Sequence, residues 1–362
     1  MKHSKIVGGS TAKRVINCPG SVALCAAMPP QLESVHMAQG TMLHDVMARI
    51  LGSDNMRPED AIKGELLDTK VRIALELLGE VDPDLTMDYE VEIEVDFGRH
   101  IPGVFGSCDL VGRIGQRAIV LDWKFGDGVM VDAEENEQLL FYAAAAMRTA
   151  ETAWAFSGVD EIECVIVQPP AIRRWVTTPA RVKQFETDLK AAVKMAQRAD
   201  APLKTGDHCR WCTAKPTCPL VTGAADRALQ AKVDQLDVTQ INGYLRNADL
   251  LEGWITSLRE LALQMLESGA KLPDYKLVAK RAVRNWTDEE KAKVALFAYG
   301  LTESDVMEKK MISPAKAEKL LKKLPEGLTV SISSGSTLAS VDDPRPAVRS
   351  FQFLNKLKVS NV

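Results

Sequence analysis

The chain has 362 residues, 46% of them hydrophobic and 26% charged, which is ordinary for a soluble globular protein with room for two domains. Its formal net charge of -4 argues against binding nucleic acid through bulk positive charge, but it is compatible with a local basic groove. No apolar run is long enough for a membrane span, and the first residues lack the apolar segment of a secretory signal, so we expect a cytoplasmic protein.

The first part of the chain is predicted to combine helices and strands. The elements are, in chain order, a helix at 34–52, strands at 89–97, 104–114 and 118–125, a helix at 133–150, a strand at 162–170 and a helix at 179–200. The strand at 89–97 alternates strictly between polar and apolar residues, and a short turn joins the second strand to the third. This order predicts an α/β fold with a mixed sheet flanked by helices.

The C-terminal part is expected to form a separate region. Its predicted elements are a long or broken helix at 225–268, short helices near 287–299 and 313–323, and an irregular segment rich in Ser, Pro and Asp at 331–350. We place the boundary near 222–226, which gives a first domain at 1–224 and a mainly helical second region at 225–362.

An acid and a base share one face of the third strand, in the segment IVLDWKFGDG. Side chains alternate across a strand, so Asp122 and Lys124 point to the same side. If this strand pairs with the one before it, Asp109 approaches Asp122 across the ladder. Two carboxylates that close repel each other unless a cation lies between them. Mg²⁺ binds carboxylate, water and phosphate oxygens, and it activates water for attack on a phosphodiester.

Further side chains fit around these acids. His44 in the first helix adds an imidazole ligand, which favours Mn²⁺ somewhat over Mg²⁺. Gln138 and Tyr142 lie one turn apart on the same face of a later helix. Lys124 is placed to steady the nucleophile or the developing negative charge. Taken singly, each piece also has an ordinary explanation, with His44 as a hydrogen-bonded core residue, Asp122 and Lys124 as a solvated ion pair, and QLLFY as an amphipathic helix.

The series GTMLH, GSCD, LDWK and QLLFY resembles the RecB-like branch of the PD-(D/E)XK nuclease superfamily, over about residues 10–222. That pattern consists of a helix histidine, a G-x-x-D strand, a (D/E)-x-K strand and a Q-x-x-x-Y helix. The resemblance implies a restriction-endonuclease-like core with a mainly helical extension. The roles it implies are metal ligation by His44, Asp109, Asp122 and the backbone carbonyl of Trp123, and a catalytic set of Lys124, Asp109, Asp122, Gln138 and Tyr142, of which the last two support the site or contact DNA.

The cysteines form a second pattern. Cys209, Cys212 and Cys218 are clustered, and three thiolates need a fourth ligand to complete a zinc site or an iron–sulfur cluster. RecB-like nucleases with an iron–sulfur staple have one cysteine before the core and such a group after it, and that resemblance implies a [4Fe–4S] cluster on Cys18, Cys209, Cys212 and Cys218. Zn²⁺ is the alternative at this site, and Cys25 is an alternative fourth ligand to Cys18.

Together these patterns predict a metal-dependent DNA exonuclease with Mg²⁺ or Mn²⁺ and an iron–sulfur cluster. The C-terminal part resembles an uncharacterised phage and prophage family, which implies a role in phage DNA recombination or replication in the host cytoplasm. The expected partner is DNA, with no membrane; phage recombination or replication proteins and a homo-oligomer are left open. The alternatives are a non-catalytic DNA-binding scaffold and a structure-specific endonuclease. Candidate phosphate contacts are Lys13, Arg14, Arg173, Arg174 and Arg210.

Overall fold

The computed structural model divides the chain into two compact units, Met1–Trp254 and Ile255–Val362, and we describe each by itself. The structure describes residues 4–30, 35–52, 69–126, 130–229, 239, 245, 247–280, 282–307, 311, 313–321, 324–332, 336–340 and 345–348. The first unit extends beyond the boundary that we predicted near 222–226. Among the described residues, no helix is long and apolar enough to cross a membrane.

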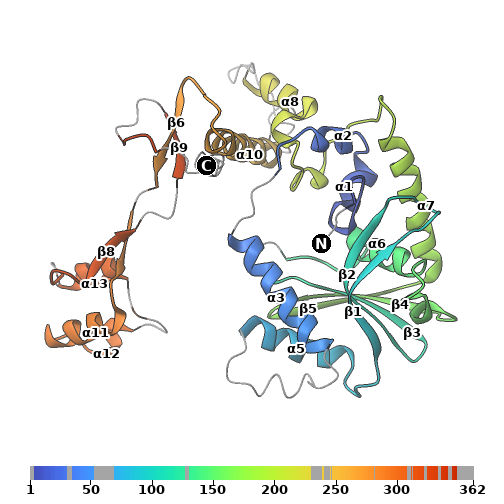
Figure 1. Ribbon diagram of the computed structural model, residues 1–362, viewed down its shortest axis with the longest axis horizontal. Coiled ribbons are helices and arrows are strands. Elements are labelled where there is room, and N and C mark those ends of the chain that lie inside the picture. The colour runs from blue at the N-terminus through green and yellow to red at the C-terminus, as the bar shows by residue number, and fades with distance from the viewer. Residues whose placement is uncertain are drawn as a thin grey trace, which may run out of the picture. The chain divides into compact units, whose positions relative to one another are not determined.

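A five-stranded mixed sheet forms the centre of the first unit (Figure 1). Its strands are β1 Asp88–Asp96, β2 Phe105–Ile114, β3 Arg117–Trp123, β4 Glu161–Gln168 and β5 Ala171–Thr177. They lie in sequence order, antiparallel except for the parallel pair β3 and β4. The predicted α/β fold with a mixed central sheet flanked by helices is confirmed, but β5 was not predicted.

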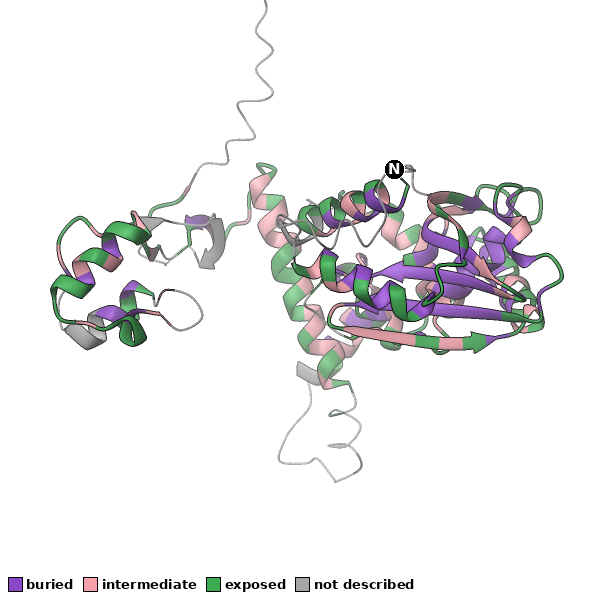
Figure 2. Ribbon diagram, turned by 90° about the horizontal axis from the view of Figure 1, so that it is seen from below, coloured by how far each residue is buried: buried purple, intermediate pink, exposed green. Residues whose placement is uncertain are grey.

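Helices cover both faces of this sheet. The helices of the first unit are α1 Ala12–Asn17, α2 Ser21–Ala26, α3 Val35–Leu51, α5 Thr69–Val81, α6 Glu137–Ala146, α7 Pro179–Ala196 and α8 Pro219–Leu229, with 3₁₀ turns η1 Gly9–Thr11, η2 Ala153–Phe156, η3 Asp207–Cys209 and η4 Lys215–Thr217. One apolar core joins α1, α6 and α7 to the sheet, and the other joins α3 and α5 to its opposite face. Figure 2 shows the sheet largely buried between these two layers.

Local sequence explains why α6 starts where it does. Asn136 caps the helix, because its side chain accepts hydrogen bonds from the backbone N–H groups of Gln138 and Leu139. Every residue from 139 to 146 is buried, so α6 is a central helix rather than an amphipathic surface one. It forms part of the crossover that the parallel pair β3 and β4 requires. Gln138, in its first turn, is thereby placed beside the sheet.

The second unit has a small core of its own. Its elements are the C-terminal part of α10 Ala248–Glu267, followed by β6 Tyr275–Ala279, β7 Val283–Trp286, α11 Glu289–Ala298, α12 Glu303–Val306, α13 Pro314–Leu321, β8 Thr329–Ile332 and β9 Ser336–Ser340. The strands pair as β6 with β9 and β7 with β8. Leu296, Val306, Ala317 and Leu324 form the core, and Trp286 packs against it. The helices α10, α11 and α13 were predicted, whereas α12 and the four short strands were not.

Candidate active site

Three carboxylates from neighbouring strands lie in one row across the sheet. The register of β1 against β2 places Glu92 opposite Asp109, with paired positions on both sides. The register of β2 against β3 places Asp109 opposite Asp122, one step beyond the last paired residues. We call Glu92, Asp109 and Asp122 the acid row. Asp109 and Asp122 were predicted from the sequence as neighbours across this ladder.

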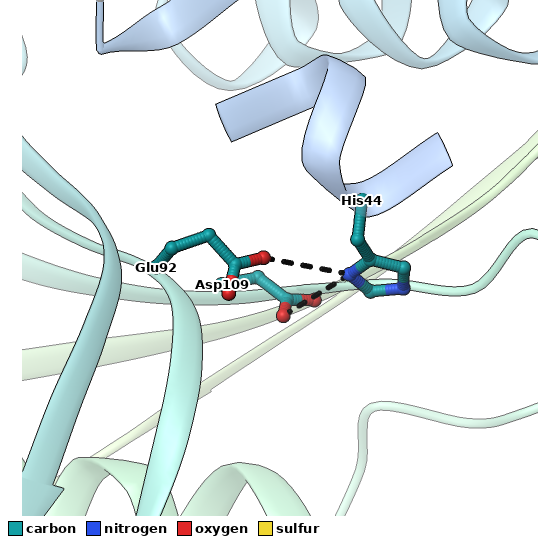
Figure 3. Close-up of side chains that lie close together, drawn as sticks. All are labelled: His44, Glu92 and Asp109. Carbon is teal, nitrogen blue, oxygen red and sulfur yellow. Dashed lines mark ion pairs between the residues drawn. The ribbon is translucent and has the colours of Figure 1, made fainter. Parts of the chain in front are cut away.

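His44 on α3 lies over the first two members of the acid row. Its Nδ1 is 3.3 Å from Asp109 Oδ1 and 3.7 Å from Glu92 Oε1. Figure 3 marks both ion pairs with dashed lines. The backbone N–H of Trp123 donates to the other oxygen of Asp109, Oδ2, at 2.7 Å. Burial lowers the pKa of His44, but the two carboxylates outweigh it and raise the pKa to about 10. In the absence of a bound metal, His44 is therefore a cation held between two carboxylates.

The third acid of the row, Asp122, is engaged with Lys124 and with α6. Lys124 Nζ lies 2.6 Å from Asp122 Oδ2 and donates to Gln138 Oε1 at 3.1 Å. Gln138 Nε2 donates to Asp122 Oδ1 at 2.8 Å and to the Tyr142 hydroxyl at 3.1 Å. Burial raises the pKa of Asp122 to about 6, against the opposing effect of Lys124. Side chains from the LDWK and QLLFY segments thus form one connected cluster.

Two glycines make room for the Tyr142 ring in this cluster. A Cβ at Gly9 would lie 2.5 Å from Cζ of Tyr142, far inside contact distance. A Cβ at Gly106, the glycine of the GSCD segment, would lie 3.1 Å from Phe141 and 3.3 Å from Tyr142. The G-x-x-D spacing therefore has a packing reason, because β2 passes close to α6 where Asp109 enters the site.

Sequence reasoning missed Glu92. The strict alternation of residues 89–97 places Glu92 on the same polar face of the strand as Glu90 and Glu94, both of which are exposed. In the structure Glu92 has a φ of 49°, which is uncommon for a residue with a side chain. Val91 packs against the core on the α3 side, whereas Ile93 packs against the core on the α6 side. The strand thus changes face at Glu92, and no feature of the sequence signals this.

The residues present suit a hard divalent cation. The acid row supplies carboxylate oxygens and His44 supplies a ring nitrogen, a donor set that Mg²⁺ and Mn²⁺ accept. Asp122 Oδ2 is paired with Lys124 Nζ at 2.6 Å, and Asp109 and Glu92 face His44. Three carboxylates thus face two cationic groups, Lys124 and His44, so the acid row retains negative charge that a divalent cation can balance.

The four cysteines predicted to hold a cluster line one small pocket. Cys18, Cys209, Cys212 and Cys218 meet there, contributed by the end of α1 and by the segment between α7 and α8. Cys25 lies outside the pocket lining, with its Sγ 3.8 Å from that of Cys212. The structure thus brings together thiols nearly two hundred residues apart in the chain.

Two of the five predicted phosphate contacts are engaged within the protein. Arg14 Nη1 donates to Ser21 Oγ at 2.7 Å and to Cys25 Sγ at 3.2 Å, beside the cysteine pocket. Arg174 pairs with the buried carboxylate of Glu163. Both guanidinium groups therefore have structural roles that compete with a role in binding DNA.

The other three basic residues are placed differently. Lys13 is exposed on α1. Arg210 lies over the ring of Trp211, with its Cζ atom 5.5 Å from the ring centroid. Arg173 on β5 lies opposite Ile166 of β4, which in turn pairs with Asp122 of β3. Its Nη1 is buried and makes no hydrogen bond to the described residues. Arg173 is therefore the basic residue that the sheet register aligns with the acid row.

The fold and this site define an α/β protein with a candidate metal centre on a mixed sheet. The chain belongs to the family described as protein of unknown function (DUF2800), whose family model matches residues 3–346. Among solved structures, SSO0001 is 16% identical with a TM-score of 0.30, covering 60% of this chain and 88% of its own. An alkaline exonuclease from Laribacter hongkongensis (LHK-Exo) is 12% identical with a TM-score of 0.23, covering 54% of this chain and 89% of its own. Scores this low mark a distant likeness only.

Proposed function

We propose that the protein is a Mg²⁺- or Mn²⁺-dependent deoxyribonuclease, with exonuclease action at DNA ends favoured. The observation that carries this proposal is the single cluster of Asp109, Asp122, Lys124 and Gln138 beside His44. Two buried carboxylates, Asp109 and Asp122, beside a lysine are costly to build for stability alone, because buried charges lose their hydration. The arrangement suits the hydrolysis of a phosphodiester, in which the negative charge of the phosphate must be bound and further charge develops during attack.

Each side chain of the cluster has a distinct task in this proposal. A divalent cation, when bound, would neutralise phosphate charge and supply an activated water. Gln138 orients Asp122 by donating to Oδ1, and it accepts from Lys124, so the ammonium group is fixed beside the acid. Lys124 then steadies the attacking oxygen or the charge that develops on the phosphate. Tyr142, buried behind Gln138, holds the amide in this orientation.

DNA positioning is the second part of the proposal. Arg173 lies two β-strands from Asp122, which is about 10 Å at ordinary strand spacing. This distance suits contact with a neighbouring phosphate of the DNA strand that is cut. The alignment of Arg173 with Asp122 favours it over Arg14 and Arg174, whose guanidinium groups are engaged within the protein. The setting in phage recombination or replication rests on sequence resemblance alone.

A [4Fe–4S] cluster on Cys18, Cys209, Cys212 and Cys218 is the third part. All four thiols line one pocket, which supports a single shared metal group there. Anaerobically purified protein should contain iron, and Cys218→Ala should lose it. Colourless protein with one zinc per chain would contradict the cluster.

The central test is a digestion series on end-labelled linear DNA with Mn²⁺. We expect Asp122→Asn and Lys124→Met to lose at least about 10²-fold in rate, while Lys190→Met, at an exposed lysine of α7, keeps wild-type activity. Full activity in either active-site variant would refute the assignment. Cutting of covalently closed circles would identify an endonuclease. Wild-type protein that binds DNA but leaves linear, nicked and single-stranded DNA intact would instead favour the DNA-binding scaffold.

A further inference from the structure

We propose that Glu92 is a direct ligand of the divalent cation, together with His44 and Asp109. The inference rests on the proposed function only in that a cation binds beside the acid row. It adds a residue that no sequence motif marks, and it makes β1, β2 and α3 joint contributors to one site.

The distances between donor atoms carry the first part of the argument. Ligands bound about 2.1 Å from one octahedral cation lie about 3 Å apart at right angles and about 4.2 Å apart when opposite. His44 Nδ1 is 3.3 Å from Asp109 Oδ1 and 3.7 Å from Glu92 Oε1, both within this range. Figure 3 shows the three side chains converging from separate elements. Among the residues that the structure describes, this is the one set of three such donors within 4.8 Å of one another.

The orientation of Glu92 carries the second part. Glu90 and Glu94, two positions away on either side, are exposed, whereas the Glu92 side chain is 20% exposed. Ser107 Oγ donates to Oε2 of Glu92 at 3.4 Å, so Oε1 is the oxygen that points toward His44. The carboxylate is therefore held toward the site at both oxygens.

Asp122 is already paired within the protein, so it is less available than Glu92 as the second carboxylate ligand. Its side chain is 3% exposed, and Lys124 Nζ lies 2.6 Å from Oδ2. Gln138 occupies Oδ1, and Lys124 is shared between Asp122 and Gln138. In this arrangement Asp122 works with the lysine, while Glu92 supplies the second carboxylate that faces His44. Two carboxylates and one imidazole form a donor set that favours Mn²⁺ over Mg²⁺.

The test measures Mn²⁺ binding to the full-length chain, and the readout is the decrease of the EPR signal of free Mn²⁺. Glu92→Gln should weaken Mn²⁺ binding about tenfold or more, as losses at metal sites do. Glu94→Gln, a charge-matched change at an exposed position of the same strand, should leave affinity unchanged. Thermal melting in chelator checks that the variants fold. If Glu92→Gln does not fold, Glu92→Asp keeps the charge but withdraws the oxygen, and it should weaken binding as well.

The outcomes separate this inference from the proposed function. Equal Mn²⁺ affinity in wild type and in the folded Glu92 variant, while wild type degrades DNA, would overturn the inference alone. Mn²⁺ binding that depends on Glu92 in a protein that degrades no DNA would remove the proposed function and leave the inference standing. Absence of Mn²⁺ binding to wild type would overturn the inference as well.

Discussion

Replacing Gly9 with alanine is expected to damage the site by displacing one buried ring. The added Cβ would lie 2.5 Å from Cζ, 2.6 Å from Cε1 and 2.7 Å from the hydroxyl oxygen of Tyr142. Ordinary contact begins at 3.4 Å, so the ring would have to retreat by about 0.9 Å. Tyr142 is buried and its hydroxyl accepts a hydrogen bond from Gln138, so the displacement reaches the amide that orients Asp122.

The size of the effect follows from the packing of α6. Overpacking of this kind costs about 1–3 kcal/mol, because neighbouring side chains leave their preferred rotamers. For a unit of this size the melting temperature should fall by roughly 3–10 °C. The displacement of the Tyr142 ring, passed on to Gln138 through their hydrogen bond, should also lower the rate of DNA degradation by up to about 10²-fold.

Thermal melting of the full chain under anaerobic conditions tests this reasoning. Tyr142→Leu removes the obstructing ring, so adding Gly9→Ala to that variant should cost little further stability. Gly79→Ala is the control, since a Cβ on this exposed position of α5 meets nothing within 4 Å and should stabilise the helix by up to about 1 kcal/mol. Wild-type melting of Gly9→Ala, or additive losses in the double variant, would refute the clash.

Two further predictions concern charged groups. In chelator, the pKa of His44 is raised from 6.5 to about 10, so its contribution to stability is complete below pH 6.5 and is lost as the pH rises to about 10. The stability difference between wild type and His44→Gln should shrink over that range by at most about 5 kcal/mol, and a difference independent of pH would contradict the ion pairs. Separately, Glu163→Gln should cost roughly 1–3 kcal/mol by leaving Arg117 and Arg174 without their buried partner, whereas Glu161→Gln should change stability by less than about 0.5 kcal/mol. Equal melting of these two variants would refute the claim that burial makes the difference.

The parts of the fold that were predictable have strong local periodicity or caps. Residues 118–123 form a nearly continuous apolar run, as a strand buried on both faces requires, and α6 is marked by Asn136 and its alanines. The edge strand β5 was missed because Arg173 and Arg174 interrupt its apolar pattern. β8 and β9 were missed because short, serine-rich strands resemble loops in composition, and pairing with β7 and β6 decides their structure.

The site divides in the same way. Asp109 and Asp122 were predictable, because a two-residue turn fixes the register of β2 against β3 and hence their alignment. Gln138 followed from helical spacing. Glu92 was not predictable, because its orientation depends on a single φ of 49° inside an otherwise regular strand. Alternation rules assume that the backbone keeps one conformation, and here the strand departs from that conformation at the residue that faces the site.

The charge balance of the site argues that His44 occupies the place of the cation in the metal-free protein. The acid row brings three carboxylates to a region where Lys124 is the one permanent cation among the residues described in the site, and the protonated imidazole supplies a second positive charge. A metal ion that takes Nδ1 of His44 as a ligand must displace that proton, so binding near neutral pH should release about one proton. Calorimetric titration with Mn²⁺ in buffers of different ionisation enthalpy measures this number directly. A proton release near zero would mean that His44 keeps its proton and that the carboxylates alone hold the metal.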